Sequence, residues 1–299
     1  MPYAPVWRRA IAFLIDCLLL MLPLWVIGFA FTDWLTIIGN WGRLITLALV
    51  WPYFGLLDSI DGGGQSFGKK FLKIEVRRQD GPLPSIPLSF LRSAPAALLV
   101  SCNGIGFAFE WINWLAGFVA LCFFWATVYM AICYRKQGML PHDLLSRTTV
   151  VMENNRHFTL PATKRWQPAG LIATLLLTLL VSVYLKHKLP LENPSNIMAA
   201  LQDIHTKADL GNASLNLQQT TINDKHYLSL NVSPLDKQQL SEAMAARVAN
   251  AALSSGHIML PPGGQLIVNL GHGFNLGLAS GMTWSNFHHT QAEWAALAP

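Results

Sequence analysis

The chain has 299 residues, of which 52% are hydrophobic and 12% are charged, and its formal net charge is +5. A soluble globular protein carries about 25% charged residues, so this composition excludes an ordinary soluble protein and indicates an integral membrane protein with a soluble portion. The positive charge does not indicate a nucleic-acid partner, because the basic residues are confined to particular segments. We therefore expect membrane lipids, and no nucleic acid, as partners.

Five apolar segments approach the roughly 20 residues that a helix needs to cross a bilayer. The third of them contains Pro87 and Pro95, so an interfacial helix or a re-entrant segment remains an alternative to a full crossing. The sequence thus predicts an α-helical polytopic membrane bundle of about five transmembrane helices. In chain order the predicted spans are Ala10–Phe31, Leu44–Leu57, Ile86–Phe109, Ile112–Tyr134 and Ala169–Leu185.

An acidic residue, Asp16, lies inside the first predicted span. A carboxylate at the centre of a membrane helix costs roughly 2.5 to 3.5 kcal/mol, so such a residue usually faces the bundle interior and has a partner. Arg9 lies two helical turns upstream on the same face, which predicts a charge pair between the two residues. The pair has two interpretations: a titratable site in an ion or proton path, or a structural pair that fixes helix packing. Asp58, at the end of the second span, either faces Arg9 or is a solvated helix end.

The basic residues cluster on one side of the predicted spans, which by the positive-inside rule places the N-terminus in the cytoplasm and the chain after Leu185 on the opposite side. We therefore predict a multi-pass protein of the bacterial inner membrane with a periplasmic C-terminal domain. The clusters are Arg8 and Arg9; Lys69, Lys70, Lys73, Arg77, Arg78 and Arg92; and Arg135, Lys136, Arg147, Arg156, Lys164 and Arg165.

A glycine-rich segment from Gly63 to Lys70 nearly matches the phosphate-binding motif of nucleotide-binding proteins. We reject that interpretation, because Lys70 replaces the hydroxyl residue that would hold magnesium and a membrane span precedes the segment where the motif requires a strand. We interpret the segment as a cytosolic turn whose basic residues touch anionic lipid head groups. These lipid-facing residues are Lys69, Lys70, Lys73, Arg77 and Arg78.

The sequence offers no support for catalysis, and we expect neither an enzyme nor a cofactor. His142 precedes Asp143 directly, but adjacent residues on a helix do not face each other, so a catalytic or metal-binding dyad is not predicted. The histidines of the C-terminal part match no spacing of a known metal site, and the four cysteines all lie in apolar segments as small hydrophobic residues. We predict no metal site.

Residues 189–299 carry seven acidic and four basic residues and predict one small α+β domain. It follows an RDD-like part at 1–155 and a linker with the last span at 156–188. Alternation of apolar and polar residues indicates strands, and Ser233 with Asp236 is typical of a helix start. The predicted elements are a helix at Pro194–Asp209, strands at Ala213–Thr221 and His226–Val232, a helix at Leu235–Leu253 and a strand at Gln265–Leu270, with no clear pattern from Gly271 onward.

Three motifs in order resemble the RDD family of membrane proteins, and the resemblance covers about Trp7 to Val151. Phe67 departs from the family pattern, where a small residue such as threonine is common. The resemblance implies a polytopic bundle with a cytoplasmic N-terminus, with Arg9 and Asp16 as family residues and either Asp58 or Asp143 as the second family aspartate. The motifs are Arg9-Ala-Ile-Ala-Phe-Leu-Ile-Asp16; Gly64-Gln-Ser-Phe-Gly-Lys69-Lys-Phe-Leu-Lys-Ile-Glu-Val76 with Asp80-Gly81 and Leu91-Arg92; and His142-Asp143-Leu-Leu-Ser-Arg-Thr-Thr-Val-Val151.

Two functions are consistent with the sequence. Some members of the family look like cation/proton antiporters, which suggests transport of a small ion or ligand with Asp16, Arg9, Asp58 and Asp143 as the charge-bearing residues. A eukaryotic relative looks like an assembly factor, which suggests a non-enzymatic scaffold or accessory subunit whose C-terminal domain binds a partner. We expect a homo-oligomer or a membrane-protein partner in either case.

Overall fold

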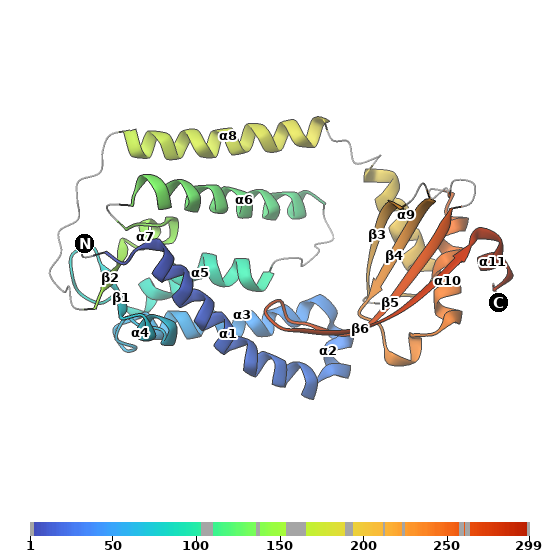
Figure 1. Cartoon of the computed structure of the whole chain (residues 1–299), viewed down its shortest axis with the longest axis horizontal. Helices are drawn as coiled ribbons and strands as arrows, with labels where there is room; N and C mark the ends of the chain where they lie inside the picture. Colours follow the sequence, from blue (N-terminus) through green and yellow to red (C-terminus); the bar gives the residue numbers. More distant parts are fainter. Residues whose placement is uncertain are drawn as a thin grey trace. The chain divides into compact units, whose positions relative to one another are not determined.

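The computed structural model describes residues 3–102, 110–135, 138–153, 166–188, 194–211, 213–222, 225–256, 260 and 264–297 (Figure 1). Of the predicted basic loop residues, Lys136, Arg156, Lys164 and Arg165 lie outside this described part. The chain divides into two compact units, which are described separately below. The first contains residues 1–24 and 43–188, and the second contains residues 25–42 and 189–299.

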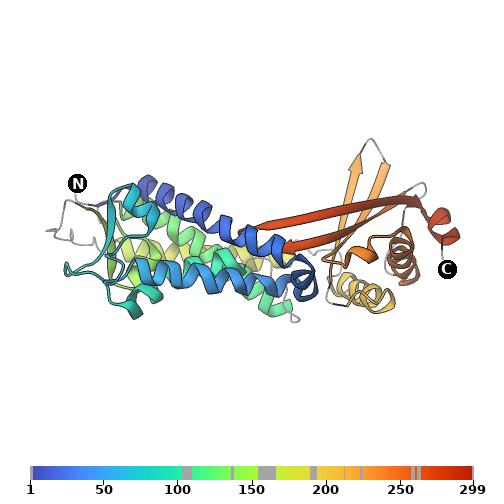
Figure 2. The ribbon, with the colours of Figure 1, turned by 90° about the horizontal axis from the view of Figure 1, so that it is seen from below.

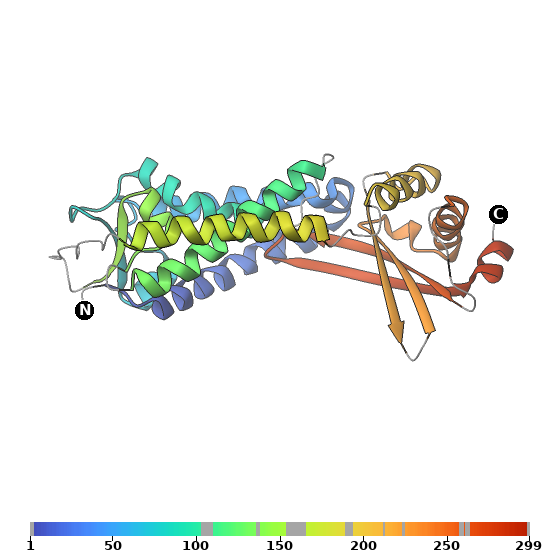
Figure 3. The same cartoon turned by 90° about the horizontal axis from the view of Figure 1, so that it is seen from above.

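The first unit is built on apolar helices that the sequence predicted from their hydrophobic runs. Among the described residues, four segments are long and apolar enough to cross a membrane: Val6–Ala30, Thr32–Leu57, Trp114–Cys133 and Gln167–Tyr184. Helix α3 packs against α5, and α6 packs against α8 (Figures 1 and 3). The helices are α1 (Val6–Ala30), α3 (Arg43–Leu57), α5 (Ile86–Cys102), α6 (Glu110–Cys133) and α8 (Trp166–Lys188).

The third predicted span corresponds to α5, which has 17 residues. Its proposed continuation at 103–109 lies outside the described residues. At 1.5 Å per residue, a 17-residue helix spans about 25 Å, slightly less than a typical hydrocarbon core. Pro95 lies inside this helix without ending it.

The two connecting segments that carry most of the basic residues fold together into a small cap at one end of this unit (Figure 1). Strand β1 pairs with β2 in an antiparallel ribbon, with Val76 opposite Val150. Side chains of Ile74, Val76 and Val150 are buried against Ala4 and Ala12 of the N-terminal segment. The cap comprises α4 (Phe67–Phe71), β1 (Ile74–Arg78), α7 (Pro141–Leu145) and β2 (Thr148–Met152).

The second unit is centred on a four-stranded sheet in the order β3-β4-β5-β6, with β4 and β5 parallel and the other pairs antiparallel. Helices α9 and α10 lie on one side of the sheet (Figure 2). Alternate residues such as Leu230, Leu266 and Val268 bury their side chains against these helices and Trp294. The elements are α9 (Pro194–Lys207), β3 (Ser214–Ile222), β4 (Lys225–Ser233), α10 (Glu242–Ser254), β5 (Gln265–Asn275), β6 (Ser280–Thr290) and α11 (Gln291–Ala296).

Two elements of this domain differ from the sequence prediction. The helix expected from Leu235 begins only at Glu242, because Ser241, not Ser233, caps it by accepting a hydrogen bond from the Met244 backbone N–H at 3.3 Å. A short 3₁₀ turn, η2 (Lys237–Gln239), precedes it. The segment after Gly271, which had no clear pattern, completes β5 and forms β6 and α11.

Residues 25–42 belong to this second unit and contain the end of α1, helix α2 (Thr32–Ile38) and the 3₁₀ turn η1 (Gly39–Gly42). The far part of the β5–β6 hairpin packs on them. The Phe29 and Phe274 rings meet edge to face at 5.4 Å, and the Thr36 hydroxyl donates to the Gly273 carbonyl at 3.1 Å. Gly28 has no side chain where the Phe274 ring packs.

We expect Gly28→Leu to destabilise this contact by about 1–3 kcal/mol, because even its Cβ would overlap the buried Phe274 ring. Limited proteolysis should then cleave the β5–β6 hairpin faster than in the unsubstituted protein. Gly211→Ala is the control. Gly211 lies in an exposed turn with a positive φ, which a side chain strains, but no atom lies within 4 Å of the added Cβ. This variant tests whether the loss of any glycine has the same effect. Equal cleavage rates for Gly28→Leu and the unsubstituted protein would contradict the expectation.

Candidate functional site

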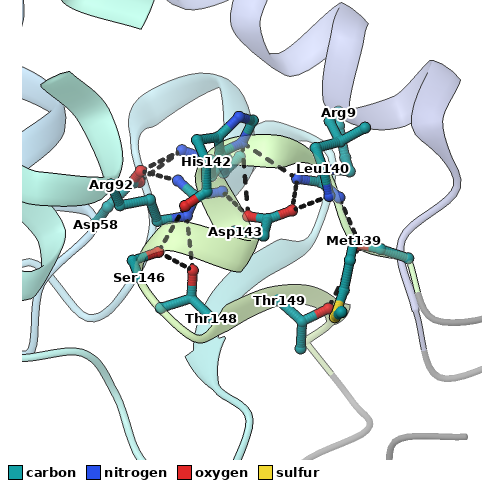
Figure 4. Close-up of polar contacts among 12 residues, drawn as sticks. Arg9, Asp58, Arg92, Met139, Leu140, His142, Asp143, Ser146, Thr148 and Thr149 are labelled. Atoms are coloured by element: carbon teal, nitrogen blue, oxygen red, sulfur yellow. Dashed lines mark hydrogen bonds and ion pairs between the residues drawn. The ribbon is translucent and has the colours of Figure 1, made fainter. Parts of the chain in front are cut away.

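Five buried charged side chains of alternating sign form a continuous chain in the first unit, and Figure 4 labels four of them, Arg9, Asp58, Arg92 and Asp143. Arg9 of α1 pairs with Asp143 of α7, and Asp143 pairs with Arg92 of α5 at 2.9 Å. Arg92 also binds Asp58, just after α3, at 3.0 Å, and Asp58 binds Lys69 of α4 at 2.6 Å. The chain therefore joins three apolar helices to both short helices of the cap.

The central carboxylate, Asp143, has no exposed surface. Besides its two arginine partners, it accepts a hydrogen bond from the Leu140 backbone N–H at 2.9 Å, which fixes the start of α7. Burial alone would raise the pKa of Asp143, but the positive charges, Arg9 foremost, outweigh burial and hold that pKa well below its usual value. The carboxylate is therefore charged at neutral pH and is held by three different groups, from α1, from α5 and from the start of α7.

His142, next to Asp143, is a neutral member of the site. Burial lowers the pKa of His142 to about 3, more than the nearby Asp143 raises it. Its Nε2 atom lies 3.4 Å from an Arg9 guanidinium nitrogen, so the neutral ring serves as an acceptor for that donor. The same nitrogen lies 3.5 Å from an Asp143 carboxylate oxygen, so the expectation that these adjacent side chains do not face each other is wrong. That they form no metal-binding or catalytic dyad stays a prediction.

The depressed pKa of His142 predicts a loss of stability on acidification. Between pH 6.5 and about 3 the unfolded chain binds a proton at this residue that the folded chain does not, so the free energy of unfolding falls as pH falls. The slope is at most about 1.4 kcal/mol per pH unit, because the two states differ by no more than one proton at this residue. Melting temperatures measured from pH 7 to 4.5 should fall less steeply in His142→Gln, which keeps a polar side chain but does not titrate. Identical slopes would contradict this assignment.

Asp16 is buried, as the sequence predicted, but its expected pairing with Arg9 is wrong. Its carboxylate accepts hydrogen bonds from the Tyr53 hydroxyl at 2.6 Å, the Ser66 hydroxyl at 2.6 Å and the Gly68 backbone N–H at 2.7 Å. Two helical turns separate Arg9 from Asp16 by about 10 Å along the axis, so each side chain reaches closer partners instead. Asp16 thus ties α1 to α3 and to the start of α4.

Asp58 is also not a partner of Arg9, nor a solvated helix end. It is 1% exposed and both its oxygens contact Lys69, while Arg92 adds a third bond. Sequence reasoning missed the bridging role of Arg92, which it used as a sign of topology and as part of a family motif. The available signal was an arginine inside an otherwise apolar helix.

The predicted lipid-facing set of basic residues is only partly consistent with the structure. Lys69 is buried and paired with Asp58, so its assignment to the lipid-facing surface is wrong. Arg77 is half-buried and pairs with Glu75 at 2.6 Å. The exposed members are Lys70, Lys73 and Arg78, and Arg78 pairs with Asp80.

A cavity of about 310 Å³ lies between the helices and borders the ion-pair chain. One part of its wall is charged and includes Arg9, Asp58 and Arg92. The other part is apolar, with aromatic side chains from three helices: Phe13, Phe54 and Phe123. The cavity thus has the size and lining of a site for a small, mostly apolar molecule with one polar end.

The family model of the RDD family matches residues 3–147. This stretch belongs to the RDD family. The matched region contains all five members of the ion-pair chain and Asp16, and with the apolar helices it identifies the protein as an integral membrane protein. No curated protein and no solved structure matches the chain.

Proposed function

We propose that the protein is a non-enzymatic accessory or scaffold subunit of a membrane complex. The observation that carries this proposal is that the acidic side chains in the centre of the RDD domain (residues 3–147) are buried and already bound to other groups of the chain. Asp16, Asp58 and Asp143 are each at most 1% exposed, and each holds at least three hydrogen bonds or ion pairs. A carboxylate that loads and unloads an ion needs a free oxygen in at least one state, whereas a structural clamp needs its oxygens filled.

We place the cap on the cytoplasmic side of the bacterial inner membrane. Exposed Lys70, Lys73, Arg78 and Arg147 all lie on the cap, which is the pattern that the positive-inside rule associates with the cytoplasm. Anionic lipid head groups attract such a surface.

The directions of the helices in the first unit support five crossings. Helix α5 begins at the cap, where Arg92 binds Asp143, and α6 returns to the cap, where it ends at Cys133. The Gln167 side chain donates to the Cys133 carbonyl at 2.6 Å, so α8 begins at the same end. An odd number of crossings would carry the chain after α8 to the periplasmic side, where we propose that the C-terminal domain meets its partner.

Purification of the tagged full chain after mild solubilisation tests the scaffold proposal. We expect a foreign membrane or periplasmic protein in a fixed ratio to the chain. A tagged Asp80→Asn variant, altered only at an exposed ion pair, should retain that partner and provides the matched control. Isolation of a homo-oligomer alone would contradict the proposal.

Transport of a small ion or ligand is the second candidate, and the cavity beside the ion-pair chain favours it. Its test is proton flux driven by sodium or lithium in vesicles that contain the purified protein. Flux that disappears in Asp16→Asn and persists in Asp80→Asn would support transport. Absence of flux in the unsubstituted protein would reject a cation/proton antiporter.

A further inference from the structure

A row of four asparagines crosses the whole sheet of the C-terminal domain. The backbone register places Asn216 opposite Asn231, Asn231 opposite Asn269, and Asn269 opposite Asn286, so each strand contributes one residue. Asparagine is depleted in strands, because its side chain competes for backbone hydrogen bonds and packs poorly on a pleated surface. Four in one row are therefore not explained by strand formation.

The asparagine row lies on the face of the sheet that points away from the core. In the two central strands the sequence neighbours of the asparagines, Leu230 and Val232 in β4 and Val268 and Leu270 in β5, are buried under the helices. In the edge strands, Leu215 and Leu217 of β3 and Phe287 of β6 are partly buried against the same core. Successive side chains of a strand point to opposite faces, so the asparagines point outward. Among the described elements, α9 and α10 lie on the core side (Figure 2).

A hollow of about 570 Å³ lies over this row. Its lining has no charged side chain. Trp284 forms one wall: it is 44% exposed, and its ring packs so close to Gly271 that a Cβ there would be 2.8 Å from it. The lining residues are Ser214, Asn216, Asn231, Ser233, Asn269, Trp284 and Asn286.

Hydrogen bonds fix the middle of the row and leave its ends available. The Asn269 amide donates to the Ser229 hydroxyl at 2.9 Å and to the Asn231 side-chain oxygen at 2.6 Å. Within the described residues, the side-chain amides of Asn216 and Asn286 make no hydrogen bond. Each amide offers two donor hydrogens and one acceptor oxygen, so the hollow presents both kinds of group along one line.

We propose that this hollow binds a neutral oligosaccharide. Sugars present hydroxyl or amide groups that donate and accept hydrogen bonds, which match the asparagine and serine lining, and apolar ring faces, which match an exposed tryptophan. An anionic ligand would require lysine or arginine in the lining, and a peptide added to a sheet binds at the edge of the sheet, not on its face. The inference rests on the proposed accessory function and names the chemistry that its C-terminal domain recognises.

Calorimetric titration of the full chain in nanodiscs tests the inference with two probes, tri-N-acetylchitotriose and cellotriose. They share ring geometry, and only the first carries acetamido groups. We expect saturable binding of at least one. Trp284→Ala and Asn286→Ala should each weaken it about tenfold, since both side chains are exposed and their loss should leave the fold intact. Gln202→Ala, an exposed amide on α9, should leave binding unchanged.

Three results would overturn the inference: no saturable binding of either sugar, unchanged binding in both hollow variants, or binding of a neutral glycine-serine hexapeptide in place of the sugars. Melting temperatures of the variants should equal that of the unsubstituted protein, which separates lost binding from lost folding. The titration and the co-purification are independent readouts. A partner protein found without sugar binding rejects only this inference, and sugar binding without a partner protein rejects only the scaffold proposal.

Discussion

Replacing Asp143 with asparagine should lower the free energy of unfolding of the RDD domain by about 3–5 kcal/mol. Asp143 lies between Arg9 and Arg92, and all three are buried. The neutral amide has almost the same shape but leaves two buried guanidinium groups with a single remaining carboxylate, Asp58, near one of them. Thermal unfolding followed by size-exclusion chromatography of the detergent-solubilised protein should show the loss as a clear drop in melting temperature.

Asp80→Asn provides the matched control, because Asp80 forms the same kind of pair with Arg78 while both side chains are about half exposed. Exposed pairs contribute about 0–1 kcal/mol, so this variant should melt almost as the unsubstituted protein does. In a double-mutant cycle, Arg9→Gln should cost less in the Asp143→Asn background than alone, with a coupling of about 0.5–3 kcal/mol. Equal effects of Asp143→Asn and Asp80→Asn would show that the ion-pair chain contributes little to stability.

The apolar helices could be predicted from the sequence, whereas the connections between them could not. A span is a local property of about 20 consecutive residues, so hydropathy locates it directly. The contact between Arg9 and Asp143 joins residues 134 positions apart, and no local pattern encodes it. The sequence could show that a carboxylate at Asp16 costs free energy inside a membrane helix. It could not show the three partners of Asp16, because they come from α3 and from the segment around α4.

The C-terminal domain shows the same limit. Strand β3 alternates apolar and polar residues from Ser214 to Gln218 and β4 from Leu228 to Ser233, and both strands were predicted. Strand β6 was not, because its sequence, Ser280 to Thr290, contains glycine, histidine and asparagine in place of a regular apolar face. The grouping of residues 25–42 with the C-terminal domain depends on side-chain packing, such as that of Phe29 on Phe274, which sequence patterns do not reveal.

The glycine-rich segment that resembles a phosphate-binding loop has a different physical explanation in the structure. Ser66 and Gly68 bind the Asp16 carboxylate, and the next residue, Lys69, binds the Asp58 carboxylate. Donors that would hold a phosphate in a nucleotide-binding protein here hold two carboxylates of the protein itself. The segment is therefore the point at which α1, α3 and the cap are joined.

Gly68→Ala should disrupt this junction and cost about 3–5 kcal/mol of unfolding free energy. A Cβ on Gly68 would overlap the backbone carbonyl oxygen of Ala12 and would lie 3.1 Å from the Asp16 carboxyl carbon. Because a helix carbonyl cannot rotate away, α1 and α4 must separate, which adds the loss of a hydrogen bond to a charged group to the cost of overpacking. The melting temperature and the yield of folded monodisperse protein are the measurements.

Gly117→Ala is the matched control, since Gly117 lies in α6 and a Cβ there would meet nothing within 4 Å. Alanine favours a helix over glycine by about 1 kcal/mol, so this variant should be neutral or slightly more stable. The comparison separates a close approach of two backbones from a general requirement for glycine in this protein. If Gly68→Ala melted at the temperature of Gly117→Ala, the contact between α1 and α4 would not constrain the fold, and the Asp16 carboxylate would be free to act in another role.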